Sequence, residues 1–158
     1  MRPNPLDEPE VPESAIVLPD YALSMLVRAC EDDLTGWRNR AALALLFGAG
    51  LRGREAVEAR LDDLDMDNRS VRVARRGHGD LNFPLGRAMA HLRPWLAARG
   101  PVPGPLLLPL RQKAGVGWFV VHGKPMGRRT LWKQVQRIGA KAGVSVSLME
   151  ARRTGGEP

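Results

Sequence analysis

Residues 43–65 decide the fold, and they read Leu-Ala-Leu-Leu-Phe-Gly-Ala-Gly-Leu-Arg-Gly-Arg-Glu-Ala-Val-Glu-Ala-Arg-Leu-Asp-Asp-Leu-Asp. An apolar run ends at closely spaced glycines, which present Arg52 in a turn. Ala and Leu are strong helix formers, so the run is predicted to be a buried helix that extends back to Trp37. A short charged helix is predicted to begin near Arg54 and to end near Leu61, before an acidic turn.

A dinucleotide-binding loop is one interpretation, because residues 48–53 match the pattern G-x-G-x-x-G. That fingerprint binds a pyrophosphate only where it follows a strand and opens the helix of a βαβ unit. Residues 41–47 contain no β-branched residue, which argues against a strand there. The helix that follows is also short for a βαβ crossover. Both observations disfavour the nucleotide interpretation of this loop.

The second interpretation is a resemblance. Gly50-Leu51-Arg52, then Glu55 and the run Ala59-Arg-Leu-Asp-Asp-Leu-Asp65, resemble the first arginine box of the tyrosine recombinases, or phage integrases. The resemblance implies that the arginine holds the scissile phosphate and that the glutamate supports the fold around it. It continues in the family's order to Thr154, through two short strands, further helices and a second arginine box.

Composition narrows the class of protein. At 158 residues the chain is long enough for one domain with a sizeable core. No apolar run reaches the ~20 residues that span a bilayer, and the N-terminus lacks the layout of a signal peptide. Cys30 is the single cysteine, and His78, His91 and His122 are too scattered to suggest zinc. We therefore expect a soluble cytoplasmic protein with no membrane contact, no metal and no cofactor.

The net charge is +7, and its distribution is uneven. Residues 1–20 are mainly acidic, whereas residues 111–154 carry many Lys and Arg side chains and one acid, Glu150. A half that basic suggests a polyanionic partner, with nucleic acid as the first candidate. The alternative is an arginine-rich soluble protein from a GC-rich genome, and composition alone does not separate the two.

The remaining elements follow from periodicity and turn residues. Residues 1–19 predict an extended arm, and Asp20 is placed to cap a helix over 21–30 that Glu31-Asp32-Asp33 closes. Strands are predicted over 70–74 and 81–85, around a glycine turn over 75–80, and a helix over 87–99 that Pro94 kinks or splits. Two further candidates for short strands are Leu106–Leu108 and Trp118–Val121, with 112–117 as a flexible inserted loop.

Residues 128–142 form the second informative stretch. Leu131, Val135 and Ile138 recur at helical spacing and are predicted to face a core. A basic stripe on another face of this helix consists of Arg129, Lys133, Arg137 and Lys141. No acid is interleaved to form i,i+4 pairs, so the like charges repel mildly unless a phosphate backbone neutralises them. We predict that this helix contacts DNA, and a solvated surface is the alternative. It resembles the family helix that lies along the major groove.

The resemblance also implies a catalytic set. In the family, two arginines and a histidine bind the phosphate, a lysine in a β-hairpin turn acts as acid, and a C-terminal tyrosine is the nucleophile. Arg52 matches the first arginine, Arg76 stands at the lysine position, and Arg152 matches the second arginine. Met149 stands at the histidine position, and Arg153 follows the second arginine.

Three departures from this set predict DNA binding without strand cleavage. The Arg76 guanidinium is a poor proton donor, because it does not titrate near neutral pH. Met149 cannot donate a strong hydrogen bond. The single tyrosine, Tyr21, lies outside the family's motif and is interpreted as a packing residue, while the family's later histidine and tyrosine boxes would lie beyond Thr154.

The expected fold class is α+β, mainly helical with a small antiparallel sheet, resembling the tyrosine recombinase catalytic domain without its C-terminal helices. Residues 20–154 would form that domain, between an arm at 1–19 and a short tail at 155–158. The expected partner is double-stranded DNA, bound by Arg52, Arg76, Arg129, Lys133, Arg137, Lys141, Arg152 and Arg153.

Alternatives remain for the function and for the key arginine. The chain could instead be a module that binds and modulates an intact recombinase, a self-associating protein, or a decayed fragment of a mobile element. For Arg52, the alternative is a structural ion pair with Glu55 or Asp63.

Overall fold

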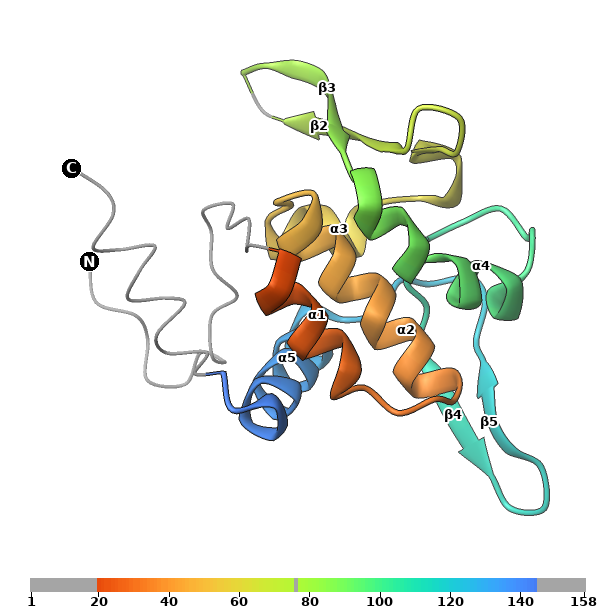
Figure 1. The fold of residues 1–158 in the computed structure, drawn as a ribbon. Coiled ribbons are helices and arrows are strands. Elements are labelled where there is room, and N and C mark those ends of the chain that lie inside the picture. Colours follow the sequence, from red (N-terminus) through yellow and green to blue (C-terminus); the bar gives the residue numbers. More distant parts are fainter. Residues whose placement is uncertain (1–19, 76, 145–158) are drawn as a thin grey trace, which may run out of the picture.

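The structure is a computed structural model, and it describes residues 20–75 and 77–144 of the 158-residue chain. The helices gather into one body, and two β-hairpins project from opposite ends of it (Figure 1). The helical elements are α1 (Asp20–Arg28), α2 (Leu34–Leu43), η1 (Ala44–Gly48), α3 (Gly53–Glu58), η2 (Leu61–Asp63), η3 (Gly86–His91), α4 (Arg93–Arg99) and α5 (Arg128–Ala142). The strands are β1 (Leu64–Asp65), β2 (Ser70–Arg75), β3 (Gly79–Pro84), β4 (Leu110–Lys113) and β5 (Gly117–Val120). The α+β fold expected from the sequence is confirmed.

The buried helix α2 begins earlier than predicted because Asp33 caps it. The Asp33 side chain accepts a hydrogen bond from the Gly36 N–H at 2.8 Å, so the helix begins at Leu34 and not at Trp37. Asp33 therefore opens α2, whereas the sequence interpretation used it only to close the preceding helix. Glycine is required at position 36, since an added Cβ would lie 1.6 Å from the Glu31 carbonyl oxygen.

The apolar run ends in the π-helix η1, directly before the glycine turn. The Leu51 N–H donates to the Leu45 carbonyl at 3.0 Å, which closes the exit from the helix tightly. Gly50 has φ 81°, a left-handed conformation that favours glycine. This turn sets Arg52 immediately before the N-terminus of α3. Short π-helical segments are frequent at functional sites.

The predicted strand pair is confirmed as the antiparallel hairpin β2–β3, and β1 pairs with the other edge of β2. Val71 lies opposite Phe83 and Val73 lies opposite Leu81. Both valines are buried, so this face of the hairpin is the one that packs on the body of the domain. β1 pairs with Ser70 and Val71 at the start of β2, and so lies at the opposite end of this strand from Arg75.

Pro94 splits the segment after β3, as the sequence predicts. The 3₁₀-helix η3 precedes it, and Pro94 stands in the first turn of α4, where its missing N–H breaks no helical hydrogen bond. The prediction of a strand at Leu106–Leu108 is wrong. That segment is fully buried outside any strand, with the Leu106 carbonyl accepting from the Trp95 indole at 2.9 Å.

The segment interpreted as a flexible inserted loop is instead part of a regular hairpin, β4–β5. Gln112 pairs with Trp118 and Lys113 pairs with Gly117, so only 114–116 form the turn. The strand candidate at Trp118–Val121 is confirmed in substance as β5. Residues 112–117 are regular because the backbones of β4 and β5 pair, and the local sequence alone did not indicate this pairing.

Helix α5 has the predicted bounds, and its predicted core residues Leu131, Val135 and Ile138 are all buried. It packs against α1, α2 and α3, while its other side, which carries Arg129 and Lys133, is exposed. Across residues 20–75 and 77–144, no helix combines the length and the apolar character needed to cross a membrane.

Candidate functional site

Arg52 stands at the junction of the glycine turn and α3, where it is the residue before the first helical position. Its side chain is partly buried, and among the described residues its Nε is buried without a hydrogen-bond partner. A buried guanidinium N–H without an acceptor is costly unless an acceptor reaches it. The local geometry therefore leaves hydrogen-bonding capacity on Arg52 for an anion.

Glu55 organises the backbone around Arg52. One carboxylate oxygen, Oε1, accepts the Arg52 backbone N–H at 2.8 Å, which fixes the first turn of α3. The same carboxylate accepts two hydrogen bonds from Arg75, Nε to Oε2 at 2.7 Å and Nη2 to Oε1 at 2.6 Å. Burial by itself raises the pKa of Glu55, but the hydrogen bonds from Arg75 and from the Arg52 N–H outweigh it and hold that pKa below its ordinary value.

This pairing bears on the structural alternative for Arg52, an ion pair with Glu55 or Asp63. Glu55 forms its ion pair with Arg75, and Asp63 forms its ion pair with Arg72 at 2.9 Å. Neither carboxylate is therefore taken up by the Arg52 side chain, which was the structural alternative. The Arg52 backbone N–H makes the hydrogen bond to Glu55, and the charge of Arg52 also contributes to lowering the pKa of Glu55.

Arg75 is a site residue that the sequence interpretation missed. Its guanidinium lies 4.7 Å from the centroid of the Phe83 ring, so it stacks across the hairpin while it binds Glu55. A signal for it existed, because Arg75 continues the alternation of the buried Val71 and Val73 along β2 and must face the same side. Arg75 thus ties α3 to the end of β2, directly beside position 76.

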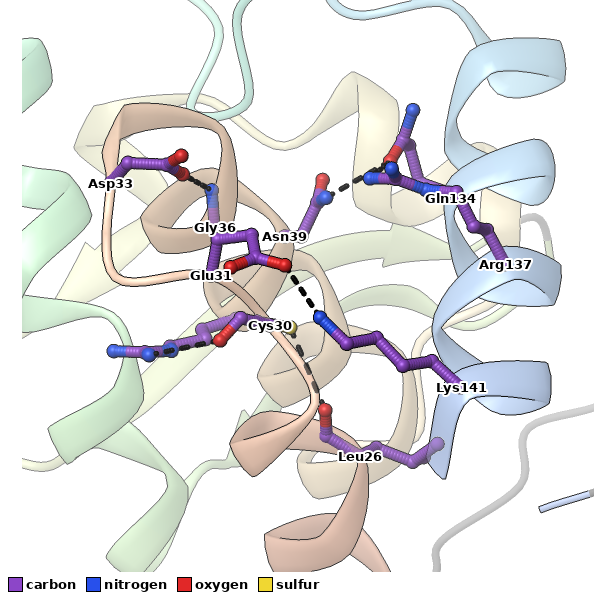
Figure 2. Close-up of polar contacts among 10 residues, drawn as sticks. Leu26, Cys30, Glu31, Asp33, Gly36, Asn39, Gln134, Arg137 and Lys141 are labelled. Carbon is purple, nitrogen blue, oxygen red and sulfur yellow. Dashed lines mark hydrogen bonds and ion pairs between the residues drawn. The ribbon is translucent and has the colours of Figure 1, made fainter. Parts of the chain in front are cut away.

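The basic stripe on α5 is partly engaged by the protein itself (Figure 2). Lys141 Nζ lies 2.5 Å from a carboxylate oxygen of Glu31, which is 110 residues away in sequence. Arg137 donates to the Gln134 side-chain oxygen at 2.7 Å, and that oxygen also accepts from Asn39 at 3.1 Å. The stripe has no acid interleaved within α5, but Lys141 is neutralised by Glu31, an acid that is remote in sequence and close in space.

The other predicted site residues fall into two groups. Arg129 and Lys133 are exposed on α5. Arg76, Arg152 and Arg153, together with Met149, lie outside the described residues. Tyr21, interpreted from the sequence as packing, is 72% exposed, because the buried face of α1 is formed by Leu23 and Leu26.

The geometry also bears on cofactors. A dinucleotide fingerprint requires a strand directly before the glycines. Here a helical segment precedes residues 48–53, which lead into the short helix α3. In the part of the chain that the structure describes, His, Cys, Asp and Glu side chains form no group of three or more that could hold a metal ion.

Comparisons with known proteins agree with this geometry. The sequence profile described as Phage integrase family matches residues 17–155. Tyrosine recombinase XerD of Staphylococcus aureus (strain Mu50 / ATCC 700699) is 29% identical over 129 residues, which cover 82% of this chain and 42% of the relative. XerD of Staphylococcus saprophyticus is 26% identical over 145 residues, with 88% and 48% covered.

The fold has a solved counterpart. The crystal structure of XerA recombinase superposes with a TM-score of 0.60 at 19% identity, covering 90% of this chain and 52% of that one. The chain thus spans under half the length of the XerD relatives and about half of XerA. On the strength of the profile match, this chain belongs to the phage integrase family, the tyrosine recombinases, and corresponds to part of their catalytic domain.

Proposed function

We propose that this chain binds double-stranded DNA and does not by itself cleave it. The observation that carries the proposal is the arginine turn. Arg52 has a buried Nε without an acceptor among the described residues, and its backbone is fixed by the carboxylate that also holds Arg75. A phosphate oxygen is the acceptor that such a guanidinium binds best, since the charged hydrogen bond is stronger than a neutral one.

The second support is the arrangement of the cations. Helix α3, which follows the arginine turn, packs against α5, so the turn and the basic stripe belong to neighbouring elements. Lys133 is exposed on α5, and residues 111–144 contain no acid at all. Such a surface attracts DNA through its phosphates, and the affinity should fall steeply as salt rises. Phosphate contacts position the protein but carry no base information, so no target sequence is proposed.

The absence of cleavage is proposed from the residue types. Transfer of a DNA phosphoryl group needs a nucleophile and an acid for the leaving oxygen. The sequence holds one tyrosine, Tyr21, which lies in α1, outside the arginine turn and the hairpin. Arg76 and Met149 occupy the positions of the family's lysine and histidine, and neither side chain transfers a proton near neutral pH.

A fluorescence anisotropy titration with a short labelled duplex tests the binding. The protein should bind at low salt, and log K should fall linearly with log salt concentration. Failure to bind any duplex at low salt would remove the DNA-binding proposal. Capture of an intact recombinase by the same preparation would then favour the interaction-module alternative.

A further inference from the structure

A cavity of about 560 Å³ lies between the start of α2, helix α5 and the β4–β5 hairpin. Its lining includes Arg38 from α2, Arg137 and Gln134 from α5, and Trp118 from β5. The volume is in the range of small-molecule sites, which run from roughly 300 to 1,000 Å³. It is separate from the arginine turn, whose residues do not contribute to its wall.

Arg38 is the unusual group in this wall. It is 4% exposed, yet among the described residues it makes one hydrogen bond, from Nη1 to the Leu108 carbonyl at 3.4 Å, and its Nε is buried without a partner. Arg99 is also buried and its Nε likewise has no partner among the described residues, but it donates three hydrogen bonds to carbonyls, at 2.7, 3.0 and 2.9 Å. Burial and then the nearby Arg137 lower the pKa of Arg38 to about 10.

The acids at the same cavity do not neutralise Arg38. Glu31 is held by Lys141, and the Asp33 side chain accepts the Gly36 N–H to cap α2. Arg137 donates to the neutral Gln134 oxygen. A buried guanidinium without a carboxylate is costly, and an anion with two oxygens would offset that cost by accepting hydrogen bonds from its planar fork of N–H groups.

Trp118 forms the opposite part of the wall and gives the cavity a flat apolar surface. Its side chain is 50% exposed, and the pairing of Gln112 with Trp118 and of Leu110 with Val120 places these four residues on one face of the hairpin. Leu110 lines the cavity as well, so this is the face turned toward it. An exposed indole beside cationic groups is a stacking surface for a planar ring.

We propose that this cavity binds a nucleotide, with its phosphate on Arg38 and Arg137 and its base against Trp118. The nucleotide can be free or can be an unpaired end of a nucleic acid strand, since the two present the same phosphate and ring. The site shares Arg137 with the basic stripe of α5, but no residue of the arginine turn lines it.

The test is isothermal titration calorimetry of the whole chain with adenosine 5′-monophosphate, followed by inorganic phosphate as competitor. Wild type should bind the nucleotide, and phosphate should compete more weakly than the nucleotide binds. Trp118→Ala should weaken the affinity by roughly five- to a hundred-fold, the loss expected of one stacked base. Arg38→Met should abolish measurable binding while the melting temperature stays the same or rises, because an unpaired buried charge is removed.

Several outcomes would overturn the proposal. One is that wild type fails to bind the nucleotide at millimolar concentration. Another is that wild type, Trp118→Ala and Arg38→Met bind it with equal affinity. If Arg38→Met fails to fold, Trp118→Ala and Arg137→Gln give a separate test, because both residues are exposed. Unchanged affinity for the nucleotide in both variants would rule out the site. A short single strand that binds more tightly than the free nucleotide would assign the strand end as the source. Duplex affinity is measured in parallel, so failure here is distinguishable from failure of the DNA-binding proposal.

Discussion

Arg75 and Glu55 join the end of β2 to α3 through two hydrogen bonds of 2.7 and 2.6 Å, across 20 residues of sequence. Both side chains are largely buried, at 16% and 10% exposure. The same carboxylate accepts the Arg52 N–H. One acid therefore holds the backbone of the arginine that is proposed to bind phosphate and the strand that leads into the hairpin turn.

The first prediction compares two arginines on β2. Arg75→Gln leaves the buried Glu55 carboxylate without its partner and should cost about 3 kcal/mol of unfolding free energy. Arg72→Gln removes the more exposed pair with Asp63 and should cost much less, because solvent screens an exposed pair. Urea unfolding followed by circular dichroism measures both. Equal losses of unfolding free energy in the two variants would show that the Arg75–Glu55 pair stabilises the fold no more than the exposed Arg72–Asp63 pair.

The second prediction concerns pH. The pKa of Glu55 lies below its ordinary value of 4.5, so the folded state favours the charged carboxylate. The resulting stability is fully present above pH 4.5 and is lost as the pH falls through the lowered pKa. Glu55→Gln should therefore flatten the acid limb of a plot of melting temperature against pH. An acid limb of unchanged steepness in this variant would refute the assignment.

The third prediction concerns α5 and assumes that duplex binding occurs. Lys133→Gln should reduce the magnitude of the slope of log K against log salt by about 0.9, the value of one phosphate contact. Arg93→Gln removes the same charge from an exposed position on α4 and should leave the slope nearly unchanged. Both substitutions should alter stability by less than about 0.5 kcal/mol. A similar slope change in both variants would indicate diffuse attraction instead of a contact at Lys133.

The fourth prediction is that no covalent adduct forms. A nicked suicide duplex incubated with the protein should give no slower band on a denaturing gel, because the chain lacks a tyrosine outside α1. An intact tyrosine recombinase with its own nicked site is the positive control. A band that appears with this chain and disappears in Tyr21→Phe would identify a nucleophile where none is proposed.

The sequence predicted those parts of the fold that local pattern determines. The bounds of α5 and the β2–β3 hairpin follow from spacing and from turn residues, and both are confirmed. The strand pairing of β4 with β5 and the contact of Glu31 with Lys141 depend on segments that meet only after folding. No residue in the sequence indicates that the apolar run ends as a π-helix, because Ala and Leu are equally compatible with an ordinary α-helix.

The candidate site was predictable in part for a similar reason. Arg52 and Glu55 stand in one local motif, so the sequence alone singled them out. Arg75 was overlooked in favour of its neighbour Arg76, although the alternation along β2 turns Arg75 toward the buried face. The identity of its partner required the structure, because the pair spans two elements.

The most direct measurement is the duplex affinity of Arg52→Gln beside that of Arg54→Gln. Arg54 is exposed on α3 two positions further along and carries the same charge, so it is a matched control. Loss of a charged hydrogen bond to phosphate should weaken binding by Arg52→Gln about ten-fold or more, with Arg54→Gln changed much less. Both proteins should melt close to wild type. Equal affinities for the two variants, or no loss in Arg52→Gln, would contradict the assignment of Arg52 as the phosphate ligand.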